Sequence, residues 1–278
     1  MFNLQVYDEV LRDQVKRKKL SEKTRSGYLH KIRELEENFE EGHSSAEALE
    51  KVIRKLCDGN QQIAKYITAI KKYERDVLGS PKILLYGEPL ERLRQMQPKN
   101  KSAKKLNYSE KTYIKKFNRI ENEKLKLAFR LQEKSGLRIS EIAELRAKDI
   151  HFDETGRIFL SVRNGKGRKQ RKVEVIEDSY LREHLSAYTC QFEADEKLFY
   201  SASYMMKKAG EYGMETHDLR RINARERFRA ERNLGSTKTA ARRAVGKQLG
   251  HSNPKTTNLY LGEEWNEERG EVSGEIES

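Results

Sequence analysis

Cysteine, proline and long apolar runs are scarce in this 278-residue sequence, which has two cysteines and four prolines. The cysteines, Cys57 and Cys190, lack CxxC spacing, which argues against a disulfide framework or a zinc module and fits a reducing cytosol. No apolar run approaches the roughly 18 residues that a transmembrane helix needs, so we expect no membrane partner. The first ten residues do not place an apolar run after a basic stretch, so we expect no signal peptide and a cytoplasmic location.

The most pronounced feature of the amino-acid composition is its positive charge. Lysine and arginine number 57 against 44 aspartates and glutamates, for a formal net charge of +13. Because the last 18 residues hold seven glutamates and one arginine, the rest of the chain carries +19. A field of this sign and size favours a polyanion, above all nucleic acid, as partner. A basic protein that is simply soluble is the alternative.

The first 95 residues show helical periodicity. Ser21 is a suitable N-cap for a helix whose inner stripe includes Ile32, Leu35 and Phe39. Two further amphipathic stretches follow, with lysines and arginines on their outer faces. We predict that residues 1–95 form a small helical bundle with a basic exterior.

A lysine-rich stretch, residues 96–106, separates this bundle from a second domain. It predicts a linker, which either follows a phosphate backbone or is a solvated tether. Residues 107–261 mix helical and alternating patterns, so we expect an α+β domain, and residues 262–278 form an acidic tail. The fold is therefore predicted to be mainly α with a small antiparallel β-sheet.

The alternating patterns of the second domain predict a three-stranded antiparallel meander from KDIHFD, RIFLSV and RKVEVI. A helix ending at Gly136 and one of about nine residues, ISEIAELRA, precede the strands. Further helices are predicted over residues 178–190, 202–210, 217–233 and 237–249, with a short one after Asn253.

The first chemically suggestive motif is SGLRISEIAEL. Gly136 ends one helix and Arg138 begins the next, with Glu141 three residues on and on the same face. The carboxylate could hold the guanidinium in a fixed pose. An ordinary surface ion pair is the alternative.

The second motif, VRNGKGRKQRKV, predicts a glycine-flanked hairpin with Lys166 at its tip. The hairpin either reaches into a DNA groove, with Lys166 delivering a proton, or is a solvated basic turn. The basic residues around the tip, expected to contact DNA, are Arg163, Arg168, Lys169, Arg171 and Lys172.

The third motif, THDLRRINAR, places His217 and Arg220 in a first helical turn, with Thr216 as the expected N-cap. Both side chains could face one anion together with the free N–H groups of that turn. Simple capping is the alternative.

The fourth motif, LGHSNPKTTNLY, closes a helix at Gly250 and leaves His251 in the gap before the next one. Asn253 can cap that next helix, which carries Tyr260 about two turns along. A core tyrosine is the alternative.

Taken together, the motifs supply groups that phosphodiester chemistry needs. Arginines bind the non-bridging oxygens, a lysine or histidine can protonate the departing 5′-oxygen, and a tyrosine can attack phosphorus. The covalent bond would conserve the energy of the broken linkage, so neither a cofactor nor a metal is expected.

The order GLRISE, a GKG hairpin, HDLRR, and LGH followed nine positions later by Tyr260 resembles the tyrosine recombinase (phage integrase) family. The compact Xer-like and integrase-like members are the most similar, and the resemblance is strongest over residues 107–261. It implies a SAM-like core-binding domain and a catalytic domain that clamp double-stranded DNA from opposite sides. It also implies homo-tetramers that exchange strands through a Holliday junction, and a nucleoid-associated protein.

The resemblance implies a role for each motif residue. The roles are phosphate binding for Arg138, His217 and Arg220, proton donation to the 5′-oxygen for Lys166, transition-state stabilisation for His251, attack for Tyr260 and support of the pocket for Glu141. The tail would dock on a neighbouring protomer through Trp265; a disordered tail is the alternative.

Two departures from the family pattern stand out. His217 and His251 are 34 positions apart, which is wider than in compact Xer-like members and predicts longer helices or an added DNA contact. No arm-binding domain is expected before the first helices.

We expect integration or excision of a mobile element as the biological role. The alternatives are dimer resolution or inversion, type IB topoisomerase activity, a non-catalytic DNA-binding regulator, and a basic RNA-binding or structural protein.

Overall fold

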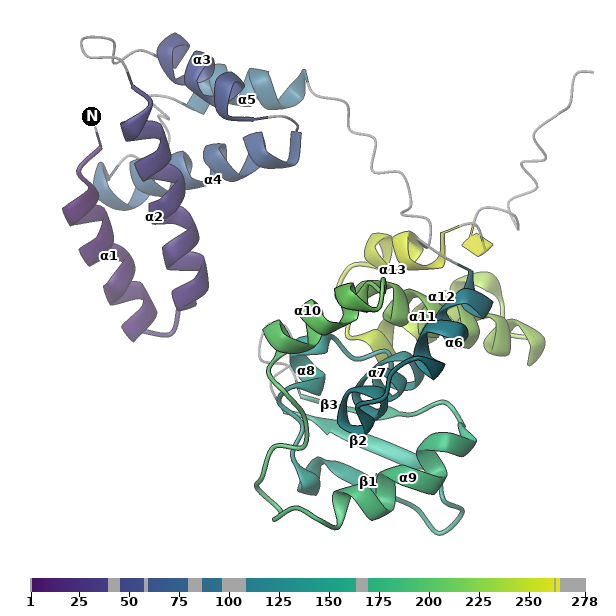
Figure 1. Ribbon diagram of the computed structural model, residues 1–278. Coiled ribbons are helices and arrows are strands. Elements are labelled where there is room, and N and C mark those ends of the chain that lie inside the picture. Colours follow the sequence, from purple (N-terminus) through teal and green to yellow (C-terminus); the bar gives the residue numbers. More distant parts are fainter. Residues whose placement is uncertain are drawn as a thin grey trace, which may run out of the picture. The chain divides into compact units, whose positions relative to one another are not determined.

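The structure, a computed structural model, describes residues 2–39, 46–57, 60–79, 87–96, 109–163, 170–262 and 264–265. The chain divides into two compact units, residues 1–101 and 102–278, and each is described by itself (Figure 1). The division falls within the predicted linker, of which only Met96 belongs to the described residues. Most of the predicted acidic tail also lies outside them.

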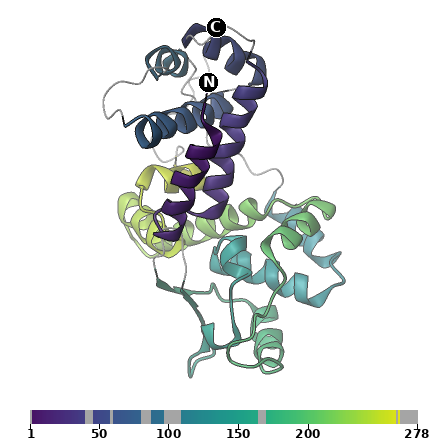
Figure 2. The ribbon, with the colours of Figure 1, turned by 90° about the vertical axis from the view of Figure 1, so that its left-hand side faces the viewer.

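The N-terminal unit is a helical bundle, in agreement with the prediction. Its helices are α1 (Leu4–Lys16), α2 (Glu22–Glu37), α3 (Ala46–Leu56), α4 (Asn60–Val77) and α5 (Gly87–Gln95). The hydroxyl of Ser21 accepts the backbone N–H of Thr24 at 3.1 Å, which confirms the predicted cap of α2. Helices α1 and α2 lie side by side in both ribbon views (Figure 2).

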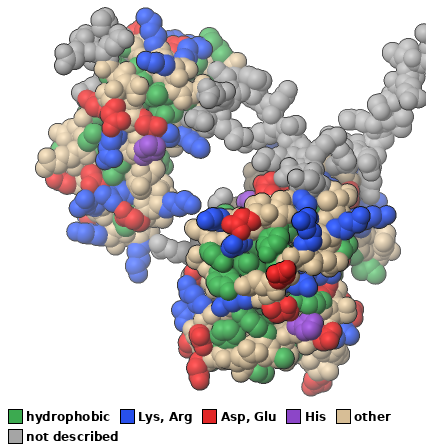
Figure 3. All heavy atoms as spheres, in the orientation of Figure 1, with side chains coloured by type: hydrophobic (Ala, Val, Ile, Leu, Met, Phe, Trp, Pro, Cys, Tyr) green, Lys and Arg blue, Asp and Glu red, His purple; other side chains and the backbone are tan. Residues whose placement is uncertain are grey.

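The core of this unit is made of buried apolar side chains from all five of these helices, among them Leu11, Ile32, Ile53, Ile67 and Leu90. Lysine and arginine side chains are prominent on the face of the unit seen in Figure 3, with carboxylates between them. The bundle therefore has the apolar interior and charged exterior that its periodicity predicts.

The C-terminal unit combines helices with one small sheet. Strands β1 (Ile150–Phe152), β2 (Ile158–Val162) and β3 (Arg171–Glu174) pair antiparallel in the order β1-β2-β3, which confirms the predicted meander. Leu160 lies opposite Ile150 on one side and Val173 on the other, and all three are buried. This register turns one face of the sheet to the core.

The other described elements of this unit are helices, and most of the motif residues lie in them or at their ends. They are α6 (Glu110–Asn118), α7 (Glu123–Ser135), α8 (Ile139–Ile142), the 3-10 helix η1 (Ala147–Asp149), α9 (Ser179–Thr189), α10 (Ala202–Glu211), α11 (Thr216–Asn233), α12 (Lys238–Leu249) and α13 (Pro254–Leu261). Within the described part of the chain, no helix has the length and hydropathy to cross a bilayer.

The predicted nine-residue helix ISEIAELRA is wrong in its length. Helix α8 has four residues, because the chain then bonds to a distant segment instead of continuing the helix. The carbonyl of Leu145 accepts the N–H of Leu198 at 3.1 Å, and the N–H of Ala147 donates to Glu196 at 3.2 Å. These tertiary backbone bonds override a local helical preference.

Candidate active site

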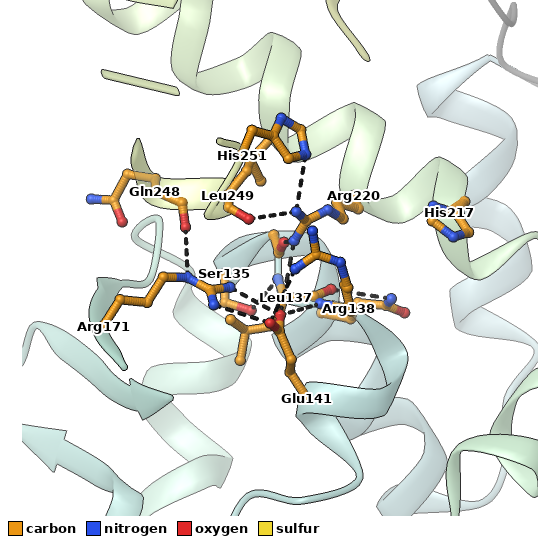
Figure 4. A network of polar contacts seen from close by, with 12 residues as sticks. Ser135, Leu137, Arg138, Glu141, Arg171, His217, Arg220, Gln248, Leu249 and His251 are labelled. Atoms are coloured by element: carbon orange, nitrogen blue, oxygen red, sulfur yellow. Dashed lines mark hydrogen bonds and ion pairs between the residues drawn. The ribbon is translucent and has the colours of Figure 1, made fainter. Parts of the chain in front are cut away.

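Glu141, at the start of α8, is a buried carboxylate around which arginines gather (Figure 4). Its Oε2 accepts the backbone N–H of Arg138 at 2.8 Å, and its Oε1 accepts Nη1 of the same residue at 3.2 Å. Burial would raise the pKa of Glu141, but hydrogen bonds from Arg171 and from the Arg138 backbone outweigh burial and lower it. The carboxylate is therefore a fixed negative charge that orients Arg138.

Arg171, the first residue of β3, occupies a different place from the predicted one. It was expected among the hairpin residues that contact DNA, but its side chain points inward and is 13% exposed. Its Nη1 and Nη2 donate to Oε1 and Oε2 of Glu141 at 3.0 and 2.9 Å, and its Nε donates to the carbonyl of Gln248 at 3.2 Å. Figure 4 shows Arg138 and Arg171 on either side of the carboxylate.

Arg220, on α11, is 1% exposed and is held by backbone carbonyls. It donates through Nη1 to Gly136 and through Nη2 to Leu249, the latter at 2.5 Å. Burial, with the nearby charge of Arg138, lowers the pKa of Arg220 to about 10, so it stays protonated at neutral pH. Among the described residues, its buried Nε has no hydrogen-bond partner. A buried cation with an unmade hydrogen bond is suited to an anionic ligand.

Two glycines make this packing possible. Gly136 and Gly250 have φ of +69° and +66°, the left-handed region that favours glycine. A Cβ on Gly136 would lie 2.4 Å from Oδ1 of Asn223, and a Cβ on Gly250 would lie 3.2 Å from Cζ of Arg171. The helix ends predicted at these glycines are confirmed, and each glycine also leaves room beside the arginines.

His251 lies just beyond the end of α12, as predicted. Its Nε2 is 3.2 Å from Nη2 of Arg220, and its Nδ1 is 3.1 Å from Oγ1 of Thr257. A guanidinium only donates hydrogen bonds, so Nε2 accepts and the proton resides on Nδ1, which donates to the buried threonine. Thr257 thereby fixes the tautomer and orientation of the ring.

Tyr260 lies near the end of α13, whose first turn is built as predicted. Oδ1 of Asn253 accepts the N–H of Lys255 at 2.9 Å, and Pro254 begins the helix. The hydroxyl of Tyr260 is 3.1 Å from Nδ1 of His217. Its ring packs edge-on to the ring of His251, with centroids 4.8 Å apart.

Two arginine side chains also lie close to the ring of Tyr260. Cζ of Arg220 is 5.6 Å and Cζ of Arg221 is 6.0 Å from the centroid of the Tyr260 ring. Although His217 keeps an exposed side, partial burial of its ring and the charges of Arg221 and Arg220 lower its pKa. Its imidazole is therefore neutral at pH 7.

The prediction that Thr216 caps α11 is wrong. The N-cap is Glu215, and Thr216 is the first helical residue, because the N–H of Asp218 already bonds to the carbonyl of Glu215 at 2.9 Å. The side chains of His217 and Arg220 still face the same pocket. There His217 contacts the Tyr260 hydroxyl, and Arg220 contacts backbone carbonyls.

The structure thus brings together six of the seven residues that the motifs assign to the pocket. These are Arg138, Glu141, His217, Arg220, His251 and Tyr260. The seventh, Lys166, lies outside the described residues, as do Arg168 and Lys169.

The remaining two predicted DNA contacts lie near the edge of the sheet. Arg163 is half exposed and pairs through Nε with the buried carboxylate of Asp149 at 2.5 Å. Lys172 is exposed, with Nζ 4.4 Å from the ring centroid of Phe159. The side chains of Arg163 and Lys172 therefore place positive charge near the predicted hairpin.

A supporting network behind the tyrosine was not predicted. The hydroxyl of Tyr113 donates to Oδ2 of fully buried Asp218 at 2.6 Å, and Arg221 donates to Oδ1 of the same carboxylate. Desolvation and the hydrogen bond to Asp218 raise the pKa of Tyr113. Tyr113 and Asp218 are 105 positions apart, so no local spacing could have indicated the contact.

Trp265 packs on its own chain. It joins a small apolar cluster with Phe228, Leu249 and Leu261, and its ring lies under two cations. Lys238 Nζ and Arg242 Cζ are 4.8 and 5.0 Å from the ring. Docking on a neighbouring protomer stays a prediction; in the single chain the tryptophan packs against α12.

No group of three or more histidine, cysteine, aspartate or glutamate side chains that could hold a metal ion occurs among the residues with a described position. The polar groups of the pocket are mainly cationic or neutral donors, which suit a phosphate oxyanion.

A mainly helical fold with a small sheet, and a pocket of arginines, histidines and a tyrosine, are the features that the resemblance to tyrosine recombinases implies. The model of the phage integrase family matches residues 104–266, more than half of the chain. The chain therefore belongs to the phage integrase family of tyrosine recombinases, which confirms the resemblance found in the motifs.

Several named proteins are similar to this chain in sequence. A tyrosine recombinase of Thermosipho africanus is 28% identical over 212 residues, which cover 72% of this chain and 70% of that one. Tyrosine recombinase XerC of Neisseria meningitidis serogroup B is 31% identical over 142 residues, which cover 48% of this chain and 45% of that one. The chain thus spans less than half the length of the XerC relative that it matches.

Two solved structures are similar in fold. A lambda integrase dimer bound to a COC′ core site has a TM-score of 0.66 at 17% identity, with 99% of this chain and 97% of that chain covered. A lambda integrase tetramer bound to a Holliday junction has a TM-score of 0.67 at 14% identity, covering 99% and 79%. At these identities the likeness shows the fold.

Proposed function

We propose that this chain cleaves and rejoins double-stranded DNA through a 3′-phosphotyrosyl intermediate on Tyr260. The observation that carries the proposal is the arrangement of that hydroxyl, 3.1 Å from a neutral histidine, on a helix packed beside the buried guanidinium of Arg220. A nucleophile, a proton acceptor and a fixed cation are thus adjacent, as attack on a phosphodiester requires.

In the proposed first step, the phenolic oxygen of Tyr260 forms a bond to phosphorus while the bond from phosphorus to the 5′-oxygen breaks. Nδ1 of His217 accepts the phenolic proton, since its lowered pKa leaves the ring unprotonated at pH 7. The 5′-oxygen takes a proton from Lys166, whose role rests on its place in the hairpin motif. Rejoining is the reverse, so the phosphotyrosyl bond conserves the energy of the linkage.

The arginines stabilise the negative charge that develops on the non-bridging oxygens. Arg220 offers its buried Nε, which has no partner among the described residues, and Arg138 offers the guanidinium that Glu141 orients. His251 lies beside Arg220 and the tyrosine ring; when a bound phosphate replaces the contact with Arg220 and the ring takes up a second proton, Nε2 can donate to the same oxygens. Donors fixed in advance at a site shielded from water contribute most to such catalysis.

The domain roles and assembly belong to the same proposal. The N-terminal bundle, residues 1–95, and the catalytic domain, residues 107–261, clamp the duplex, and residues 96–106 link them. Support comes from the fold shared with lambda integrase, whose structures hold a core site and a Holliday junction. Four copies would exchange strands, with the acidic tail, residues 262–278, passing from its own chain to a neighbour.

The proposed biological role is integration or excision of a mobile element. The relative named XerC favours a second candidate, dimer resolution or inversion by a Xer-like recombinase. The DNA that flanks the gene distinguishes these roles, because element ends and resolution sites differ in their repeats.

Covalent capture tests the proposed chemistry and recovers the target sequence in the same experiment. A pool of nicked duplexes with a randomised central sequence is incubated with the protein, and DNA that stays bound after denaturation is sequenced. We expect a recurring sequence from the wild type and none from Tyr260→Phe, which should retain binding to the recovered duplex. Equal capture by the two proteins would remove Tyr260 from the role of nucleophile.

A further inference from the structure

We propose that Arg171 is a positioning residue of the recombinase pocket. It fixes Glu141 on one side and the end of α12 on the other, and through them the guanidinium groups of Arg138 and Arg220. This inference rests on the proposed function, because it concerns the geometry that receives the scissile phosphate. It gives Arg171 a role other than the DNA contact expected from its place in a basic hairpin.

The strand geometry of β3 turns Arg171 inward. Arg171 lies opposite Val162 in the β2–β3 register, and residues paired in an antiparallel sheet point to the same face. Val162 and Val173 are buried on that face. Arg171 therefore extends from the buried side of the sheet toward the pocket, whereas its neighbour Lys172 is exposed.

On the first side, Arg171 donates half of the hydrogen bonds that Glu141 receives from the described residues. Two come from the guanidinium of Arg171, at 3.0 and 2.9 Å, and two come from the backbone and side chain of Arg138. Nη1 of Arg220 is 4.0 Å from the same carboxylate. Without Arg171, a buried carboxylate would lack donors and would draw Arg138 and Arg220 toward itself, away from a phosphate.

On the second side, Arg171 holds the end of α12. Its Nε donates to the carbonyl of Gln248 at 3.2 Å, and the next carbonyl, of Leu249, anchors Nη2 of Arg220 at 2.5 Å. The guanidinium lies against Gly250, where a Cβ would come within 3.2 Å of it. The side chain of Arg171 thus holds Glu141 and the end of α12, which position the pocket arginines. His251 directly follows the end of α12, so its position depends on the same contact.

The shape of the guanidinium is essential to this role. Only a planar fork can meet both carboxylate oxygens of Glu141 while a third N–H reaches Gln248. A lysine preserves the charge but makes a single point contact. Arg171→Lys therefore separates positioning from a general electrostatic effect, and Arg171→Ala removes both.

Arg130 provides a matched control in the same unit. It also pairs with a buried carboxylate through two nitrogens, with Nε and Nη2 at 2.9 and 2.6 Å from Oδ2 of Asp178, and its Nη1 donates to Glu133 at 3.0 Å. These partners lie on α7 and before α9, and none belongs to the pocket. Arg130→Ala thus removes a comparable ion pair without touching the proposed machinery.

The test measures single-turnover cleavage at saturating DNA, and DNA affinity separately, on the duplex recovered by covalent capture. We expect Arg171→Ala and Arg171→Lys each to slow cleavage by about 10- to 100-fold, the size of effect that a small misplacement of catalytic groups produces. Affinity should change less than about threefold, and Arg130→Ala should cleave like the wild type per folded molecule. Arg171→Ala should slow cleavage by a smaller factor in a Glu141→Ala background than in the wild type, because part of its effect acts through Glu141 and the rest through the end of α12.

Failure of the inference and failure of the proposed function give different results. If the wild type captures DNA and both Arg171 variants cleave like Arg130→Ala, Arg171 is not a positioning residue. If the wild type captures no DNA, the proposed function fails, and protection against thermal unfolding by inorganic phosphate then decides the inference. Weaker protection of both Arg171 variants than of Arg130→Ala supports positioning of the pocket arginines, and equal protection overturns it.

Discussion

Replacing Gly136 with alanine tests the packing that holds Arg220. The residue has φ of +69°, so a side chain would cost about 1–2 kcal/mol in backbone strain. The new Cβ would also lie 2.4 Å from Oδ1 of Asn223 and 2.6 Å from Cδ2 of Leu249, both fully buried. Overpacking of this kind adds about 1–3 kcal/mol, so we expect the free energy of unfolding to fall by about 2–5 kcal/mol.

Substitutions at two other glycines of the same unit measure the backbone strain separately from the overpacking. Gly156 has φ of +79° and nothing within 4 Å of its would-be Cβ, so Gly156→Ala should show the strain alone, about 1–2 kcal/mol. Gly210, on α10, has neither constraint, so Gly210→Ala should stabilise the unit by up to about 1 kcal/mol. Urea denaturation followed by the fluorescence of Trp265, the single tryptophan, reports on this unit. If Gly136→Ala is no more destabilising than Gly156→Ala, close packing does not constrain Gly136.

Four further predictions concern the pocket and its DNA. Arg220→Lys should slow covalent capture at least about 100-fold, because the single nitrogen of an ammonium cannot reach two carbonyls and a phosphate that three guanidinium nitrogens span; unchanged capture would remove Arg220 from the pocket. Thr257→Val should slow capture about tenfold while the melting temperature barely changes, since His251 loses its orienting partner at 3.1 Å; a large drop in melting temperature would instead indicate a structural role. Capture should decline on acidification below pH 6.5, as His217 takes up a proton at its lowered pKa, and this decline should vanish in His217→Gln. The logarithm of DNA affinity should fall steeply with the logarithm of salt concentration, and a flat response would contradict a phosphate-binding clamp.

Residue types and short-range patterns predicted those parts of the site whose conformation depends on a few neighbouring residues. Gly136 and Gly250 end helices in the left-handed region, and Asn253 with Pro254 starts α13, because these residue types favour those conformations wherever they occur. The strands followed from alternation, and Arg171 could have been placed from the same signal. It shares the face of Val173 and Val175, so period-two alternation already pointed it inward, although the basic hairpin suggested solvent.

Contacts between distant segments could not be predicted in this way. The length of α8 depends on backbone bonds from Leu145 and Ala147 to a segment about 50 residues later. The pairing of Tyr113 with Asp218 and the bond from Arg171 to Gln248 join residues whose spacing carries no pattern. Family resemblance indicated which residues belong to the pocket, but only the structure shows which of them touch.

Mass spectrometry of the protein–DNA adduct tests the central claim most directly. After capture on a nicked duplex and digestion with protease and nuclease, the account predicts one modified peptide, which contains Tyr260 joined to a 3′-phosphate. The released strand should carry a free 5′-hydroxyl. An adduct on another residue, or a 5′-phosphate joined to the protein, would contradict the account.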